Sequence, residues 1–303
     1  MSAPSVTIRV PGSTSNLGPG FDTLGIALRI YNRARVTTTA GRGVRIVSPI
    51  ADGAREAATG LVAEAARAFF RAARKPSFGF EIHLSGDVPI ARGLGSSVTV
   101  RLGVVAALNE LADAGLTRQQ LFELVSDLEG HPDNAAPATF GAFTASAMIG
   151  REARCVRIAV PSSFRFVTLI PNFEIETAAA RRLVPDSFSK ADTVHNLTRV
   201  SLITAAFAQG DAEVLRGAFA DRIHQPYRQS LIPQLTKVIR SGERAGAVGG
   251  WLSGSGSTII CLTVKNPEAV AQAMAKALPG SETRILAADK GGYQTSQASD
   301  PCS

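Results

Sequence analysis

The clearest chemical signal in this sequence lies at residues 87–97, where glycines and hydroxyl groups precede a long apolar run. Residues 93–97 read Gly-Leu-Gly-Ser-Ser, and the apolar run follows at 98–111. Two glycines permit backbone angles that are closed to other residues, so successive N–H groups can point into one concavity. A helix that follows adds unpaired N–H groups and the positive end of its dipole. The pattern therefore predicts a strand, a phosphate-binding loop and a buried helix.

The same five residues could also form a simple Gly-Ser turn that caps a core helix, and the pentapeptide alone leaves both interpretations open. Two common nucleotide-binding patterns are absent, because the sequence has neither GxxxxGK[ST] nor GxGxxG with its acidic partner. In the phosphate-binding interpretation, the hydroxyls of Ser96 and Ser97 bind phosphate oxygens or a magnesium ion.

A second cluster of reactive groups reads Glu-Gly-His-Pro-Asp-Asn at residues 129–134. The proline stops the preceding helix, so we expect these groups to project from a loop at its end. The Glu129 carboxylate suits an oxygen-binding ion such as magnesium. Asp133 and Asn134 suit a substrate that carries a hydroxyl, whereas His131 taken singly is more often a structural hydrogen-bonding group. The cluster as a whole indicates a functional site.

Periodicity and breaker residues predict the elements around these motifs. Strands are expected at 5–10, 31–39, 78–85 and 165–170, and from 258 to 264. Helices are expected at 60–74, 98–111, 117–128, 192–209, 211–219, 234–246 and 267–278. The helix at 117–128 has a capping-box signal, with Thr117 as N-cap and Gln120 three residues later. Residues 11–22 are too rich in turn formers for helix or strand, and the end of the chain after residue 290 is predicted to be frayed.

The composition is that of a globular protein, with 45% hydrophobic and 19% charged residues. Few long parallel-strand runs occur, so the fold class is predicted to be α+β with two layers. The 32 basic against 25 acidic residues give a net charge of +7, but they are scattered and predict no nucleic-acid partner.

The sequence also bears on location and metal binding. No apolar run has the roughly 18–20 residues needed to span a membrane, and the start of the chain shows no secretory signal. Cys155, Cys261 and Cys302 are far apart and show no metal-binding spacing. We therefore expect no membrane association and a reducing, cytoplasmic location.

Four motifs together give the chain a resemblance to the GHMP superfamily of small-molecule kinases, and within it to the homoserine kinases. The first is Pro-Gly-Ser-Thr-Ser-Asn-Leu-Gly-Pro-Gly-Phe-Asp at 11–22, and the second is the glycine loop at 89–99. The third is the cluster at 129–134, and the fourth is Leu-Ser-Gly-Ser-Gly-Ser-Thr at 252–258. They span almost the whole chain and occur in the order of the family.

The resemblance implies a fold, a reaction and its cofactors. Residues 1–155 would form an ATP-binding domain like domain 2 of ribosomal protein S5, and residues 156–303 a ferredoxin-like C-terminal domain. The implied reaction consumes ATP with magnesium and converts L-homoserine to O-phospho-L-homoserine, a step toward threonine. A homodimer is also implied.

The resemblance also assigns roles to single residues. Asp133 and Asn134 would act on the reacting hydroxyl, and Ser97 and Glu129 would hold magnesium. The ATP-binding residues would be Pro89, Ile90, Ala91, Arg92, Gly93, Leu94, Gly95, Ser96, Ser97, Val98 and Thr99. The homoserine-binding residues would be Asn16, Asp22, His131, Asn134, Arg181 and Arg228. Independently of the family, two arginines can clamp an amino-acid carboxylate bidentately, although either could also be a solvated surface charge.

The chain departs from the family pattern at three places. Val98 and Thr99 follow Ser97 where the family has small residues, and Gly60 replaces an asparagine of the adenine-side helix. The fourth motif reads Gly-Ser-Gly-Ser-Thr in place of Gly-Ala-Gly-Pro-Thr. Two alternatives follow: another GHMP kinase, for mevalonate, shikimate or a methylerythritol derivative, and a catalytically inactive nucleotide-binding module.

Overall fold

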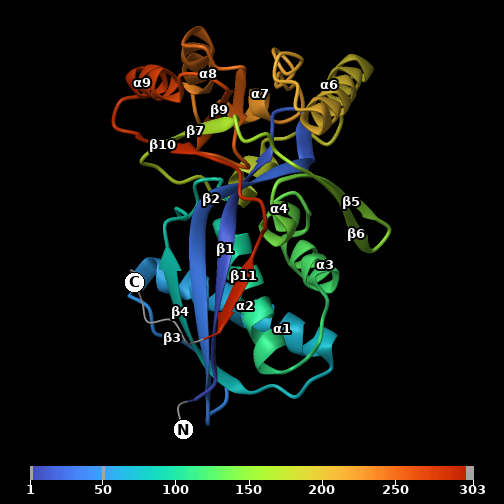
Figure 1. The fold of residues 1–303 in the computed structure, drawn as a ribbon, viewed down its shortest axis with the longest axis vertical. Helices are drawn as coiled ribbons and strands as arrows, with labels where there is room; N and C mark the ends of the chain where they lie inside the picture. Colours follow the sequence, from blue (N-terminus) through green and yellow to red (C-terminus); the bar gives the residue numbers. More distant parts are fainter. Residues whose placement is uncertain (1–2, 50–51, 298–303) are drawn as a thin grey trace.

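The first half of the chain forms a sheet with helices packed on one face, in the lower part of Figure 1. Figure 1 shows a computed structural model, which describes residues 3–49 and 52–297. The strands of this sheet are β1 (Ser5–Asn16), β2 (Gly20–Thr39), β3 (Val44–Ile46), β4 (Gly79–Gly86), β5 (Phe143–Ile149), β6 (Glu152–Ile158) and β11 (Gln294–Gln297). The helices are α1 (Asp52–Ala73), α2 (Ser96–Leu111), α3 (Arg118–Glu129) and α4 (Ala135–Phe140).

The strand order of the first sheet is β11-β1-β2-β4-β3, and β5 pairs with the start of β2 and with β6. All its pairs are antiparallel except β3 with β4. Alternate residues of β1, β2 and β4 face the helices, and they pack with the apolar faces of α1, α2 and α3 into one core that includes Phe69, Phe80 and Phe122. This packing fixes the N-terminus of α2 at one end of the sheet.

The second sheet lies in the upper part of Figure 1 and is antiparallel throughout, in the order β10-β7-β9-β8. Its strands are β7 (Arg165–Ile170), β8 (Gly249–Leu252), β9 (Ile259–Thr263) and β10 (Glu282–Leu286). The helices of this half are α5 (Thr177–Arg182), α6 (Lys190–Gln209), α7 (Gln225–Arg228), α8 (Leu235–Arg244) and α9 (Pro267–Ala277). The two sheets, with helices on each, confirm the predicted α+β class.

A second core joins the two halves. The start of β2 contributes Leu24 and Ile26, which pack in one cluster with Phe143, Phe207 and Trp251. The chain also returns to the first sheet at its end, because β11 pairs with β1. The division of the chain at residues 155/156 stays a prediction.

Three predicted elements are wrong. Residues 11–22 are mostly strand, since β1 runs to Asn16 and β2 starts at Gly20. Turn-forming residues are tolerated there because β1 pairs with β2 through two register shifts and its small side chains are buried. Residues 211–219 form successive turns rather than a helix, and Gly217 has φ 73°. The segment after residue 290 is not frayed throughout, because β1 supplies β11 with a partner strand.

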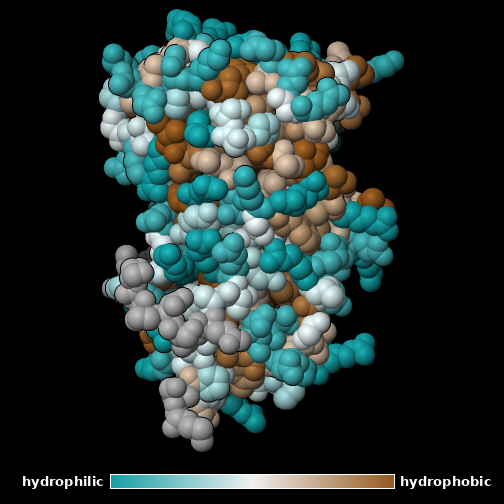
Figure 2. Space-filling view, in the orientation of Figure 1, coloured by the Kyte–Doolittle hydropathy of each residue, from teal (hydrophilic) through white to brown (hydrophobic). Residues whose placement is uncertain are grey.

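Other predictions agree closely with the structure. The strand at 165–170 has the predicted bounds, and helices occupy most of 60–74, 98–111, 117–128, 192–209, 234–246 and 267–278. No helix in the described ranges is long and apolar enough to cross a membrane. Figure 2 shows hydrophilic side chains spread over the whole visible face, with apolar ones between them. Cys302 lies outside the described residues.

The capping box at the start of α3 is confirmed. The Thr117 hydroxyl accepts a hydrogen bond from the Gln120 N–H at 3.2 Å, and the Gln120 side chain accepts one from the Thr117 N–H at 2.8 Å. These two bonds satisfy N–H groups that the helix itself cannot pair.

We expect Thr117→Ala to lower the free energy of unfolding by about 1 kcal/mol, because it removes the cap. Chemical denaturation measures this change. Thr198→Ala is the matched control, since Thr198 is exposed within α6 and bonds only to backbone carbonyls of its own helix; its effect should stay within about 0.5 kcal/mol. Equal stability of Thr117→Ala and the parent would contradict the importance of the cap.

Candidate active site

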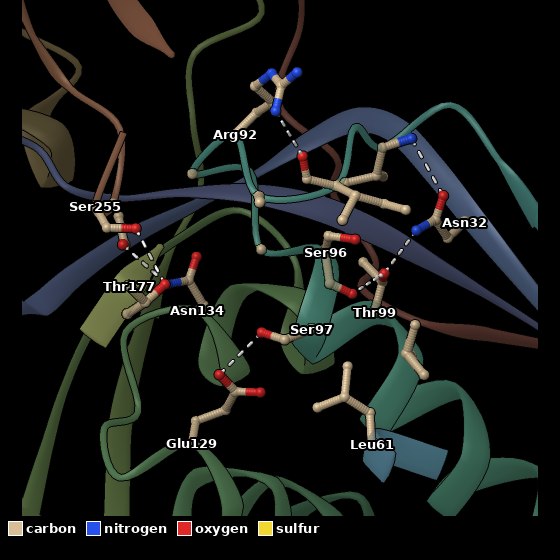
Figure 3. Close-up of a pocket in the computed structure, with 18 of the residues that line it drawn as sticks. Asn32, Leu61, Arg92, Ser96, Ser97, Thr99, Glu129, Asn134, Thr177 and Ser255 are labelled. Carbon is tan, nitrogen blue, oxygen red and sulfur yellow. Dashed lines mark hydrogen bonds between the residues drawn. The ribbon is translucent and has the colours of Figure 1, made fainter. Parts of the chain in front are cut away.

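The described residues form a cleft of about 920 Å³ in which all four motifs meet. Its walls come from β1 and β2, the end of β4, the loop before α2, the loop after α3, α5 and the segment that follows β8. Segments from both halves of the chain thus line one cavity, which the close-up in Figure 3 shows.

The glycine loop has the backbone that a phosphate cradle requires. Gly93 and Gly95 have φ of 76° and 71°, in the region that favours glycine. A Cβ on Gly95 would lie 2.5 Å from the Ser13 Oγ. α2 starts at Ser96, and no side chain of the described residues caps its first N–H groups. These N–H groups and the helix dipole can therefore serve an anion in the cleft.

The fourth motif holds this loop in place. The Ser253 hydroxyl donates to the Gly93 carbonyl at 2.6 Å, and the Thr258 N–H donates to the Arg92 carbonyl at 3.1 Å. A Cβ on Gly93 would lie only 2.1 Å from the Ser253 carbonyl oxygen. The two glycine-rich segments therefore pack backbone against backbone, which explains why both are rich in glycine and serine.

Glu129 is the last residue of α3 and turns toward the start of α2. Its Oε2 accepts a hydrogen bond from the Ser97 hydroxyl at 3.1 Å (Figure 3), and its Oε1 accepts one from Arg101 at 2.5 Å. A carboxylate oxygen beside a hydroxyl at the mouth of a phosphate loop is a donor set that fits magnesium. The residues present therefore fit the ion that kinases commonly use.

The loop after α3 forms a network of charged and amide groups. Gly130 follows the last residue of α3 with a φ of 79°, and His131 Nδ1 bonds to the Asp133 carboxylate. Burial opposes the charge of Asp133, but the hydrogen bond and charge of His131 outweigh burial and lower the pKa of Asp133. Burial likewise opposes the charge of His131, yet Asp133 raises the pKa of His131. Asp133 is therefore ionised at neutral pH.

Asn134 is fixed by two serines of β1. The Ser13 hydroxyl donates to its Oδ1 at 2.8 Å, and its Nδ2 donates to the Ser15 Oγ at 2.9 Å. The first and third motifs are thus bonded directly to each other.

Asp22 and Arg181 form a bidentate ion pair in the same cleft. The two guanidinium nitrogens donate to the two carboxylate oxygens at 3.0 and 2.8 Å. Asp22 has φ 55°, and its N–H donates to the Asn16 Oδ1 at 3.1 Å. Asn16 Nδ2 in turn donates to the Gly254 carbonyl at 3.0 Å. The strained backbone at Asp22 is typical of residues whose side chains are held for a function.

Arg228 is almost fully buried beside this pair. Its Nη1 donates to the Gly254 carbonyl at 3.0 Å and to His224 Nδ1 at 3.2 Å, and its guanidinium lies over the Phe21 ring. Burial and the nearby charge of Arg181 lower the pKa of Arg228 to about 10, so it stays charged at neutral pH.

Three side chains offer their ligand atoms to one point of the cleft. Single atoms of Asp22, His131 and Asp133 lie within 4.8 Å of one another. Each carboxylate already has a partner there, Arg181 for Asp22 and His131 for Asp133.

The structure collects most of the sequence-predicted site residues in this cleft. Of the predicted ATP-binding residues, those that line it are Ile90, Ala91, Arg92, Gly93, Gly95, Ser96, Ser97 and Thr99. Leu94 and Val98 are instead buried in the two cores, and Pro89 does not line the cleft. The metal and substrate candidates, Asn16, Asp22, Glu129, His131, Asp133, Asn134, Arg181 and Arg228, all line it.

Sequence reasoning missed other residues. Asn32 bonds to Thr99, Leu61 lines the wall toward α1, and the hydroxyls of Thr177 and Ser255 lie 3.2 Å apart across the cleft. Only Ser255 lies within one of the four motifs, the one at 252–258. Asn32 lies in a strand and Leu61 in an ordinary amphipathic helix, so only their tertiary position marks them.

Comparisons with known proteins identify the family of the chain. The family model of the GHMP kinases N terminal domain matches residues 60–142, and that of the GHMP kinases C terminal matches residues 203–280. The fold and the two matches define the class of protein, a GHMP kinase.

Individual relatives identify the family within this class. A homoserine kinase from Moorella thermoacetica is 36% identical over 270 residues, which cover 89% of this chain and 91% of the relative. A homoserine kinase from Microchaete diplosiphon is 38% identical over 275 residues, which cover 89% of both chains. The crystal structure of homoserine kinase from Cytophaga hutchinsonii has a TM-score of 0.87 at 26% identity and covers 96% of this chain and 97% of that chain. The chain belongs to the homoserine kinase family.

We expect Gly95→Val to reduce ATP affinity more than about tenfold while the fold survives, because a branched side chain would occupy the concavity and meet Ser13. Calorimetric titration with ATP measures the affinity. Gly115→Val is the matched control, since Gly115 has φ 70° but open space around its Cα. It carries the same backbone strain and should bind ATP normally. Unchanged ATP binding by Gly95→Val would show that this loop does not bind ATP.

Proposed function

We propose that this chain transfers the γ-phosphoryl group of ATP to the hydroxyl of L-homoserine, giving ADP and O-phospho-L-homoserine. The observation that carries the proposal is one cleft with a phosphate-type loop and, facing it, the Asp22–Arg181 pair. Membership of the homoserine kinase family supports the same reaction. In threonine biosynthesis this reaction activates the hydroxyl as a leaving group.

The Asp22–Arg181 pair matches the two charges of a free amino acid. A guanidinium can pair both oxygens of a carboxylate at once, and the carboxylate of Asp22 can accept an ammonium group. The Asp133 carboxylate lies close to Asp22, so an ammonium that replaces Arg181 on Asp22 would have a second carboxylate nearby. Arg228 lies beside the pair as a second cation for the substrate carboxylate.

ATP would bind with its phosphates at the N-terminus of α2. The wall beyond the loop is largely apolar and includes Ala58, Leu61 and Val100, which suits the base of a nucleotide. Ser97 and Glu129 would hold magnesium, which would supply positive charge to balance that of the phosphates. The cytoplasmic location, which the cysteine pattern predicts, and the homodimer, which the resemblance implies, remain proposals.

Phosphoryl transfer depends mainly on positioning and on charge stabilisation. Asn134 is held rigidly by Ser13 and Ser15, and its neighbour Asp133 is ionised. We assign both the role of orienting the homoserine hydroxyl toward the γ-phosphate.

A coupled ADP-release assay over homoserine, mevalonate and shikimate tests the reaction itself. We expect turnover with homoserine far above that with the other two. A higher kcat/KM on either of them would replace the proposal by another GHMP-type activity, and ATP binding without ADP release on any alcohol would point to an inactive nucleotide-binding module.

Glu129→Gln should lower turnover about 100-fold or more while homoserine binding changes little. Metal charge stabilisation is worth several kcal/mol, and about 1.4 kcal/mol corresponds to tenfold. Steady-state kinetics at saturating homoserine measures the loss. Glu123→Gln, on the same helix, is the control. If Glu123→Gln is crippled instead, the metal assignment is wrong.

Arg181→Ala should raise the homoserine KM strongly and leave the ATP KM nearly unchanged. Truncating one partner of a charge pair costs about 2–5 kcal/mol. Because the Arg181 side chain is 37% exposed, we expect the lower end, roughly 30-fold. Homoserinol, which lacks the carboxylate, should be a poor substrate of the parent and lose little further in the variant.

Arg228→Ala should raise the same KM, and it also removes buried bonds to the carbonyls of Ala180 and Gly254. Its melting temperature must therefore be compared with that of Arg181→Ala. Parental homoserine kinetics in both variants would place the carboxylate clamp elsewhere.

A further inference from the structure

Arg101 is a charged residue of α2 that directly precedes the apolar stretch 102–108. It follows Ser97 by one helical turn, so both side chains lie on the same face of α2. Its side chain is only 12% exposed, and its Nε is buried with no hydrogen-bond partner among the described residues. Burying a charge is costly unless it is paired, so the position needs an explanation beyond packing.

Arg101 connects two carboxylates from two other helices. Its Nη1 donates to Glu129 Oε1 at 2.5 Å, and its Nη2 donates to Glu64 Oε2 on α1 at 2.7 Å. The Glu129 side chain is as buried as that of Arg101, whereas the Glu64 side chain is 46% exposed. The guanidinium fork is rigid and planar, so it fixes the direction of each carboxylate that it binds.

The two carboxylate oxygens of Glu129 have different partners. Oε1 is occupied by Arg101, and Oε2 is left to face the Ser97 hydroxyl at the mouth of the phosphate loop, as Figure 3 shows. Without Arg101, the carboxylate could rotate and neither oxygen would have a fixed direction. Glu64 compensates the guanidinium, so the three groups together keep one net negative charge for a cation.

We propose that Arg101 is a positioning residue that holds Glu129 with a single oxygen turned toward Ser97, and that it thereby strengthens binding of the nucleotide-associated divalent cation. The inference rests on the proposed role of Glu129 as a metal ligand. Groups that orient metal ligands typically change metal affinity about 10–100-fold when they are removed.

A purely electrostatic role predicts the opposite sign. Arg101 is a cation near a cation site, so its removal would by itself tighten metal binding. Positioning predicts that removal weakens metal binding. A role confined to joining the three helices predicts lower stability with no change in metal affinity.

The test is electron paramagnetic resonance titration of Mn²⁺ into the full-length protein saturated with a non-hydrolysable ATP analogue. We expect Arg101→Met to weaken Mn²⁺ binding about tenfold or more. The Mg²⁺ concentration needed for half-maximal turnover should rise in parallel, with the homoserine KM unchanged. Unchanged or tighter Mn²⁺ binding overturns the proposal. Arg154→Met, at an exposed ion pair with Glu152, is the matched control and should bind Mn²⁺ as the parent does.

Two further variants keep the test decisive. Arg101→Lys keeps the buried charge but lacks the planar fork, so it should lose less Mn²⁺ affinity than Arg101→Met. If Arg101→Met does not fold, parental Mn²⁺ binding by Arg101→Lys overturns the proposal.

In a Glu129→Gln background, Arg101→Met should cause no further change in Mn²⁺ affinity. If Glu129→Gln itself leaves Mn²⁺ binding unchanged, the proposed metal ligand is wrong and this inference falls with it. If Glu129→Gln weakens binding and Arg101→Met does not, only the role of Arg101 is wrong.

Discussion

The backbone contact between Gly93 and Ser253 is the constraint on which the rest of the site depends. A side chain on Gly93 would lie 2.1 Å from the Ser253 carbonyl oxygen, and the Ser253 hydroxyl donates to the Gly93 carbonyl. Through this contact the loop before α2 packs against the segment after β8, so residues from both halves of the chain line one cleft. Asn16 and Arg228 both bond to the neighbouring carbonyl of Gly254, which ties the substrate side of the cleft to the same point.

The cleft distributes its charges in pairs. Asp22 forms an ion pair with Arg181, Asp133 with His131, and Glu129 with Arg101. The pair with His131 lowers the pKa of the buried Asp133 carboxyl, whereas an unpaired buried carboxylate would tend to become neutral. Two of the pairs join separate elements, β2 with α5 and α3 with α2, so a charged ligand that enters the cleft meets groups whose directions are already fixed. Such preorganisation reduces the reorganisation that a charge-transferring reaction would otherwise require.

Local signals predicted what depends on short stretches of chain. The capping box of Thr117 and the end of α3 before residues 130–132 follow from neighbouring residues alone, and the structure agrees with both. The segment 11–22 and the end of the chain were predicted wrongly because their conformation is decided by strand partners far away in sequence. A stretch rich in turn formers becomes strand when its small side chains let a neighbouring strand pack closely, and no local pattern reports that partner.

The sequence by itself determined the chemistry of the site: the glycine loop, the carboxylate at 129, the charged cluster after it and the family to which they belong. Those features depend on residues that lie a few positions apart, and such residues are close in space because the chain connects them. Only the tertiary structure decided which distant groups meet, such as Arg181 with Asp22 or Arg101 with both Glu64 and Glu129. An isolated arginine in a sequence is equally consistent with a solvated charge and with a buried clamp. Packing of the elements fixes its partner, and the cost of burying an unpaired charge then fixes its role.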